Sequence, residues 1–260
     1  MGSQMATGKA LVLRELESGK IGDPAKGVRA LGHAGSPSAT SYYESLNWAG
    51  YADNDSGGAK YTYAAGSWKQ PAITKKCKTV SGLLAVTSTW VGLDGWTDKT
   101  VEQAGTTNVC DDGTAFAFDW YEMYPAGSVG VSGIGATDSI TAVTSTNGAG
   151  QYTLTVEDST NPSDGFSVDE TCSTSTCLDS SAEWISEAPC CSGETSSGFY
   201  PLAPFKTWKL EKASSNGNTI SFYPNDNIIE GNYDYAYPLQ TTGSLGGKGT
   251  KFEVTYKASD

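Results

Sequence analysis

The chain has 260 residues, of which 17 are Lys or Arg and 29 are Asp or Glu, so its formal net charge is -12. This charge repels nucleic acid and anionic membrane surfaces, and we expect neither as a partner. No apolar run reaches the roughly 20 residues that a membrane-spanning helix needs. Gly is frequent at 31 residues and charged residues are sparse at 18%, a composition typical of short strands joined by many turns.

Residues 1–40 differ from the rest because they carry five basic and three acidic side chains. The first five residues resemble an expression-vector remnant that has replaced a signal peptide. We interpret the remainder of this leader as a pro-segment that docks on the acidic body by charge and leaves when carboxylates are protonated. A flexible, unprocessed tail is the alternative. Residues 41–260 are expected to form the catalytic domain.

From Asn47 onward the sequence is patterned as strands. Residues 85–94 alternate so that Trp90 and Asp94 share one face, and residues 116–125 place Trp120, Glu122 and Tyr124 together. The other predicted strands cover residues 60–68, 139–144, 151–157, 181–187, 219–223 and 251–257. Many short strands at roughly even spacing predict an all-β sandwich or barrel.

Six cysteines form an even set, and disulfides are the expected use. The expected pairing joins Cys77 to Cys110 and the four later cysteines, at 172, 177, 190 and 191, among themselves. Residues 53–58 resemble the start of a calcium loop, but the twelfth position is Ala64, where such a loop needs Glu. We therefore expect a turn there, and no metal or cofactor. Asn54 also begins a glycosylation sequon.

The common nucleophilic machinery is missing from the sequence. A Ser or Cys peptidase needs a His base, and the single histidine, His33, lies in the leader. Ligands for a catalytic zinc and a phosphate-binding glycine loop are also missing. The chemistry that remains uses carboxylates, amides and aromatic rings.

Five short strings occur in order over residues 47–205 and together resemble the glutamic peptidase (eqolisin) family. They are Asn-Trp-Ala-Gly at 47–50, Trp-Val-Gly-Leu-Asp-Gly at 90–95, Gln-Ala-Gly at 103–105, Trp-Tyr-Glu-Met-Tyr-Pro at 120–125 and Ala-Glu-Trp-Ile at 182–185. The resemblance implies an antiparallel two-sheet, jelly-roll-like β-sandwich with a substrate cleft on its concave sheet.

The resemblance also implies the site residues. The catalytic pair falls on Gln103 and Glu183. The residues implied to line the substrate cleft are Trp90, Asp94, Trp120, Glu122 and Tyr124. One departure concerns Asp119, because family members often carry an acidic residue one position earlier. The shift moves the carboxylate to the other strand face, so no cleft role is carried over to it.

These residues suffice for peptide hydrolysis. Glu183 can take a proton from water and later give one to the leaving amine, while the amide of Gln103 can both donate to the oxyanion and accept from the water. Carboxylates crowded around one cleft raise each other's pKa, which predicts an acidic optimum.

Two other functions use the same residues. A glycoside hydrolase could employ Glu122 and Glu183 as its acid and base, which leaves Gln103 without a role. A lectin-like sandwich could stack sugars on the tryptophans. The favoured interpretation is a secreted, monomeric endopeptidase that acts on polypeptides in acid.

Overall fold

The computed structural model describes residues 21–33, 40–54, 58, 60–74, 77, 84–189, 198–231, 236 and 238–257. Within these residues the chain is almost entirely strand and turn, with one 3₁₀ helix, η1 (Ile220–Phe222). The part of the chain described contains no helix long and apolar enough to cross a membrane. The all-β prediction is confirmed.

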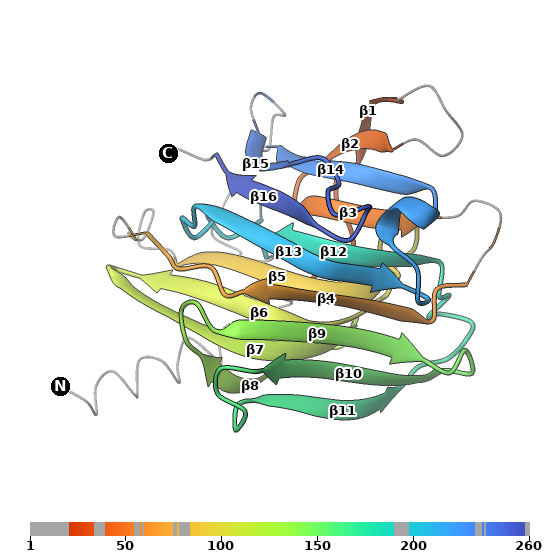
Figure 1. The fold of residues 1–260 in the computed structure, drawn as a ribbon, viewed down its shortest axis with the longest axis horizontal. Helices are drawn as coiled ribbons and strands as arrows, with labels where there is room; N and C mark the ends of the chain where they lie inside the picture. Colours follow the sequence, from red (N-terminus) through yellow and green to blue (C-terminus); the bar gives the residue numbers. More distant parts are fainter. Residues whose placement is uncertain are drawn as a thin grey trace.

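The strands follow the chain as shown in Figure 1. They are β1 (Arg29–His33), β2 (Ser41–Ser45), β3 (Trp48–Asn54), β4 (Tyr63–Lys69), β5 (Ala85–Leu93), β6 (Val101–Asp111), β7 (Thr114–Tyr124), β8 (Val129–Ile134), β9 (Ser139–Thr146), β10 (Gln151–Asp158), β11 (Gly165–Thr171), β12 (Ser181–Glu187), β13 (Thr207–Ser215), β14 (Asn225–Gly231), β15 (Pro238–Thr242) and β16 (Phe252–Tyr256).

The strands pair in the order β11-β10-β9-β4-β13-β16-β15-β14-β3-β12-β5-β6-β7-β8. The hydrogen-bonded path folds over on itself, so that β9 and β10 pack against β5 and β6 as two layers (Figure 1). Pairing along this path is antiparallel, whereas β2 joins the edge of β14 in parallel. The predicted antiparallel sandwich is therefore confirmed.

The core between the layers follows from strand alternation. In β10, Tyr152, Leu154 and Val156 are buried while the residues between them are more exposed. In contrast, every residue of β5 and β12 is buried. A strand with one solvated face would alternate, so both faces of these two strands are covered.

The predicted strand at 219–223 is wrong. These residues form η1, in which Phe222 N–H donates to Thr219 C=O, and Pro224 follows at the end of the turn. A 3₁₀ helix has three residues per turn, so it places Ile220 and Tyr223 on the same side. Both pack on the core while Phe222 is exposed. The other predicted strands are present, with ends that differ by a few residues.

Two disulfides join described cysteines. Cys77 is bonded to Cys110 as predicted, and Cys172 is bonded to Cys177, which agrees with pairing among the later cysteines. Cys190 and Cys191 lie outside the described residues, as does part of the 53–58 turn.

Candidate active site

Four positions lie in one row across β12, β5, β6 and β7. The register pairs Glu183 with Gly92, Gly92 with Gln103, and Gln103 with Glu122. Directly opposed residues of an antiparallel sheet point to the same face. The side chains of Glu183, Gln103 and Glu122 therefore share one face of this layer.

This face is the outer one. Val91, Ala104 and Trp184 alternate with the row and belong to the core between the layers. The outer face carries a second apolar cluster, which includes Trp90 and Trp120, both fully buried. The sequence thus builds two apolar surfaces on one sheet, and the polar row crosses the outer one.

Gly92 separates the two proposed catalytic side chains. Glu183 and Gln103 sit on the strands flanking β5, so about 10 Å separates their backbones at two strand spacings. A Cβ on Gly92 would lie 2.9 Å from the Trp90 ring and 3.2 Å from the Gln103 Cβ. The Trp90 ring and the Gln103 side chain therefore pack directly over Gly92, and a side chain at this position would displace them.

Gln103 is fully buried and its amide is held in a defined orientation. Its Nε2 donates to Glu122 Oε2 at 3.2 Å and to the main-chain carbonyl of Gly22 at 2.7 Å. Among the described residues, its Oε1 has no hydrogen-bond partner. The amide therefore presents an acceptor that is not used within this part of the chain.

Glu183 is also fully buried, and neither carboxyl oxygen has a hydrogen-bond partner in the ranges described. Burial raises the pKa of Glu183 well above its ordinary value, and the negative charges of Asp94 and Asp98 raise it further. A carboxyl with a raised pKa and no fixed partner is suited to exchanging protons.

A short stretch of the leader, residues 21–26, crosses this face; we call it the cover segment. Ile21 packs in the outer apolar cluster, and Gly22 N–H donates to Glu122 Oε2 at 2.9 Å. Ala25 N–H donates to the Gly95 carbonyl at 3.1 Å. The segment is thus bound mainly through its peptide groups.

Further bonds to the cover segment come from residues at the start of β3 and at the end of β12. Trp48 Nε1 donates to the Asp23 carbonyl at 2.9 Å, and Asn47 Oδ1 accepts from Lys26 N–H at 2.7 Å. Asp23 N–H donates to Glu187 Oε1 at 3.1 Å. An extended peptide therefore lies across the aromatic face with its main chain hydrogen-bonded.

Glu187 connects this peptide contact to the tryptophans. Its Oε2 accepts from Trp90 Nε1 at 2.8 Å, and its Oε1 also accepts from Asn47 Nδ2 at 2.9 Å. Burial raises the pKa of Glu187, and the nearby charge of Asp23 raises it further. Sequence reasoning assigned no role to Glu187 or Asn47. The signal was present, since Glu187 is four residues from Glu183 on the same strand face and Asn47 opens the first family string.

Asp94 occupies an unexpected orientation. It directly follows β5 with φ 67°, and its carboxylate accepts from the main-chain N–H groups of Asp179 at 2.9 Å and Ser180 at 2.5 Å. The expectation that it faces the same way as Trp90 assumed that the strand continues through position 94. The turn redirects the side chain, and a role of Asp94 in substrate binding stays a prediction.

The remaining site predictions lie on β7. Tyr124 packs on the outer apolar cluster at the end of the strand, and Trp120 is buried in it. Asp119 points to the other face, where it accepts bonds from the backbone and hydroxyl of Ser132 on β8. The observed face of Asp119 agrees with leaving it out of the cleft.

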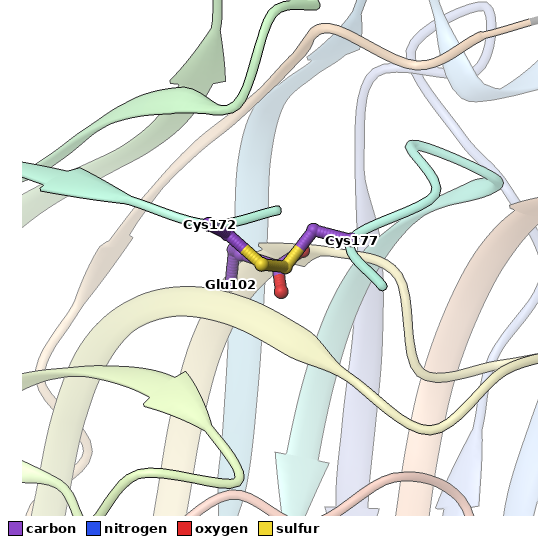
Figure 2. Close-up of side chains that lie close together, drawn as sticks. All are labelled: Glu102, Cys172 and Cys177. Carbon is purple, nitrogen blue, oxygen red and sulfur yellow. A yellow bond between two sulfur atoms is a disulfide. The ribbon is translucent and has the colours of Figure 1, made fainter. Parts of the chain in front are cut away.

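Figure 2 shows Glu102 beside Cys172 and Cys177, three residues whose oxygen and sulfur atoms lie within 4.8 Å of one another. Metal ligation by cysteine requires a thiolate. Both sulfurs are bonded to each other instead, so this group does not offer the donors of a metal site.

Comparison with known protein families gives a match over most of the chain. The sequence model described as "Peptidase A4 family" matches residues 46–256. No curated protein matches the chain. The match includes Gln103 and Glu183 but lies beyond the cover segment.

Several solved structures share the fold. A crystal structure of scytalido-glutamic peptidase with a transition state analog inhibitor is 21% identical with a TM-score of 0.64, covering 82% of this chain and 98% of that one. SCP-B, described as a member of the eqolisin family and bound to a tripeptide, is 22% identical with a TM-score of 0.62 and the same coverage. Aspergilloglutamic peptidase from Aspergillus niger is 23% identical with a TM-score of 0.51, covering 66% and 99%. The chain therefore belongs to the peptidase A4 family, and its fold is shared by solved glutamic peptidases.

Proposed function

We propose that the protein hydrolyses peptide bonds of polypeptides in acid, with Glu183 as the proton carrier and Gln103 as the oxyanion donor. The observation that carries this proposal is the single row in which the two side chains flank Gly92 on one face. In this proposal a peptide carbonyl and a water bind between the carboxyl of Glu183 and the amide of Gln103 once the segment that covers this face has left.

In the first step the ionised carboxylate of Glu183 removes a proton from water, and the hydroxide adds to the peptide carbonyl carbon. Gln103 Nε2 donates to the oxygen that becomes negative, while its Oε1 accepts a bond from the attacking water. The hydrogen bond from Nε2 to the Gly22 carbonyl supports this role, because it joins the same donor to a peptide carbonyl.

In the second step the protonated Glu183 gives its proton to the leaving nitrogen, and the bond between carbon and nitrogen breaks. The products are a carboxylic acid and an amine, and Glu183 is again ionised. Glu122 holds the Gln103 amide by its 3.2 Å bond and so keeps Nε2 directed toward the reacting oxygen.

Activity in acid depends on the pH at which Glu183 ionises. The pKa values of Glu183, Glu187 and Glu102 are all raised, first by burial and then by neighbouring negative charges. Water that enters when the cover segment leaves would reduce the burial of Glu183. Its pKa would then fall toward the ordinary range and allow the carboxylate to form at acid pH.

The cover segment supports a second part of the proposal, that residues 1–40 hold the enzyme inactive until they are removed. Gly22 uses the Nε2 donor that hydrolysis needs, and Ile21 fills the apolar cluster. One ion pair, between Arg29 and Glu44, also joins the leader to the body. N-terminal sequencing after acid incubation tests this, and an unchanged first residue would contradict it.

Secretion fits the proposal because both described disulfides need an oxidising compartment. A family of peptidases gives no support to the carbohydrate alternatives. The proposed substrates are therefore polypeptides, and we propose a monomer.

The decisive experiment incubates the acid-treated protein with denatured casein and, separately, with polysaccharides. We expect hydrolysis of casein alone, with Glu183→Gln inactive and Gln103→Ala reduced by about 10² to 10³. Glu253→Gln is the matched control, because that carboxylate lies on the surface in a pair with Lys209. Substantial casein hydrolysis by Glu183→Gln would overturn the assignment.

A further inference from the structure

A group of four carboxyls, three of them buried and Asp98 half-buried, lies behind the active-site row, where β5 turns into β6. We name this group the acid cluster, and its members are Asp94, Asp98, Glu102 and Asp179. Asp94 and Asp98 belong to the turn, Glu102 to the start of β6, and Asp179 to the segment that leads into β12. Figure 2 shows Glu102 beneath the disulfide that closes the start of this segment.

Two members of the cluster connect the turn to the segment before β12. Asp94 accepts from the N–H groups of Asp179 and Ser180, and its own N–H donates to the Ser181 carbonyl at 3.1 Å. Asp98 accepts from the Ser180 hydroxyl at 2.5 Å and from Gly95 N–H at 2.9 Å. These bonds fix the chain immediately before the strand that carries the catalytic carboxyl.

The cluster cannot be fully charged in this arrangement. Glu102 is fully buried, and neither of its carboxyl oxygens has a hydrogen-bond partner within the described part of the chain. Asp94, Asp98 and Asp179 face it with the same sign of charge. Four ionised carboxylates this close together repel each other, and the repulsion is strongest among the three that are buried.

The groups that face the cluster from other elements do little to offset this charge. Tyr152 on β10 donates its hydroxyl to Asp179 at 2.6 Å, and Lys60 acts on the same carboxyl with its positive charge. Glu183 on β12 adds another carboxyl on the far side. Burial and the Asp94 charge raise the pKa of Asp98 to about 6, and that of Glu102 also lies well above its usual value.

We propose that the acid cluster is a proton-operated latch that fixes the start of β12, and with it Glu183, as long as its carboxyls share protons. In acid the protonated members stop repelling, and the bonds from Asp94 and Asp98 hold residues 179–181. As the pH rises toward neutrality the cluster ionises and these bonds open. The opening of the backbone at residues 179–181 is expected whether or not Glu183 is catalytic. The expected loss of hydrolysis rests on the proposed catalytic role of Glu183.

The test uses the full chain with Glu102→Gln, Asp98→Asn and the pair combined. Each change removes a charge while keeping the side-chain shape. Hydrogen exchange is measured between pH 4 and pH 7 and corrected for the chemical rate. In the unmodified protein we expect the exchange rate at residues 179–183 to rise about ten-fold across this range. This rise should occur at a lower pH than any rise in the exchange rate of β9 and β10. In the variants this rise shifts to higher pH.

Glu230→Gln is the matched control, because Glu230 is fully buried with a raised pKa but bonds to Gln240 outside the cluster. It should leave the pH response of residues 179–183 unchanged. The proposal is overturned if exchange there is independent of pH, or if the variants respond like the unmodified chain. If one variant fails to fold, the other decides the outcome.

The activity profile separates this proposal from the catalytic one. In the variants we expect the fall in casein hydrolysis on the alkaline side to move to higher pH. If exchange shifts and hydrolysis does not, the latch stands and the assigned role of Glu183 is wrong. If Glu183→Gln is inactive and exchange does not shift in the acid-cluster variants, the assigned role of Glu183 stands and the latch is wrong.

Discussion

Gln103 donates a 2.7 Å hydrogen bond from its side-chain amide to the main-chain carbonyl of Gly22, a residue 81 positions earlier in the chain. The same Gly22 donates its N–H to Glu122, the neighbour of Gln103 across the strand pair. A leader peptide thus meets the site through the kinds of group that a substrate would present.

A methyl group on Gly22 should release the leader. A Cβ at this position would overlap the amide of Gln103, so Gly22→Ala cannot keep both hydrogen bonds. We expect casein hydrolysis by the full chain to begin without a lag in acid. Gly243→Ala is the control, since its Cβ would make an ordinary 3.4 Å contact with Glu253. An unchanged lag in Gly22→Ala would show that the cover segment does not limit activity.

A methyl group on Gly92 should lower the hydrolytic activity, because it would displace side chains of the candidate site. Its Cβ would lie 3.2 Å from the Gln103 Cβ and 2.9 Å from the Trp90 ring, between the two proposed catalytic side chains. We expect kcat/KM to fall by at least about ten-fold, because small displacements of reacting groups have large effects. Gly66→Ala crowds Leu210 in the other core and serves as the comparison. It should lower Tm with little effect on kcat/KM, and the opposite pattern would contradict the site geometry.

Stability should be greatest in acid and fall toward neutrality. Burial raises the folded-state pKa of Asp53, Glu187 and Glu230. Each such group stabilises the fold fully below its unfolded pKa of about 4, and that contribution is lost as the pH rises through the folded value. We expect the free energy of unfolding in urea to drop by at least about 2 kcal/mol between pH 4 and pH 7. A rise over this interval would be incompatible with neutral buried carboxyls.

The two described disulfides should differ in their effect on stability. Cys77 and Cys110 are 33 residues apart, whereas Cys172 and Cys177 are 5 apart. The loop-closure argument gives about 4 kcal/mol for the longer loop and about 2 kcal/mol for the shorter one. Paired Cys→Ser variants, compared by urea unfolding, check this order. Equal losses, or a larger loss from the short loop, would mean that strain or residual structure in the unfolded chain dominates.

Much of the fold could be predicted from alternation along single strands. Residues 151–157 are correctly predicted because the apolar residues Tyr152, Leu154 and Val156 recur at a period of two. The strand predicted at 181–187 is also present, although all of its residues are buried. The prediction failed at 219–223, where alternation was also present. A 3₁₀ turn buries both Ile220 and Tyr223, because residues three apart lie on the same side of such a turn. Pro224 has no backbone N–H, so it cannot donate a hydrogen bond to a neighbouring strand.

For the candidate site, the sequence by itself determined which residues were available. The single histidine, at position 33, left carboxylates and amides as the candidate groups, and the order of the family strings predicts Gln103 and Glu183 among them. Only the tertiary structure decided how they meet. The register sets them on either side of Gly92, the turn at Asp94 directs a predicted cleft residue toward the acid cluster, and the leader brings Gly22 to the amide. Local patterns specify the face on which a side chain lies, whereas contacts between distant segments depend on long-range strand pairing that no local pattern records.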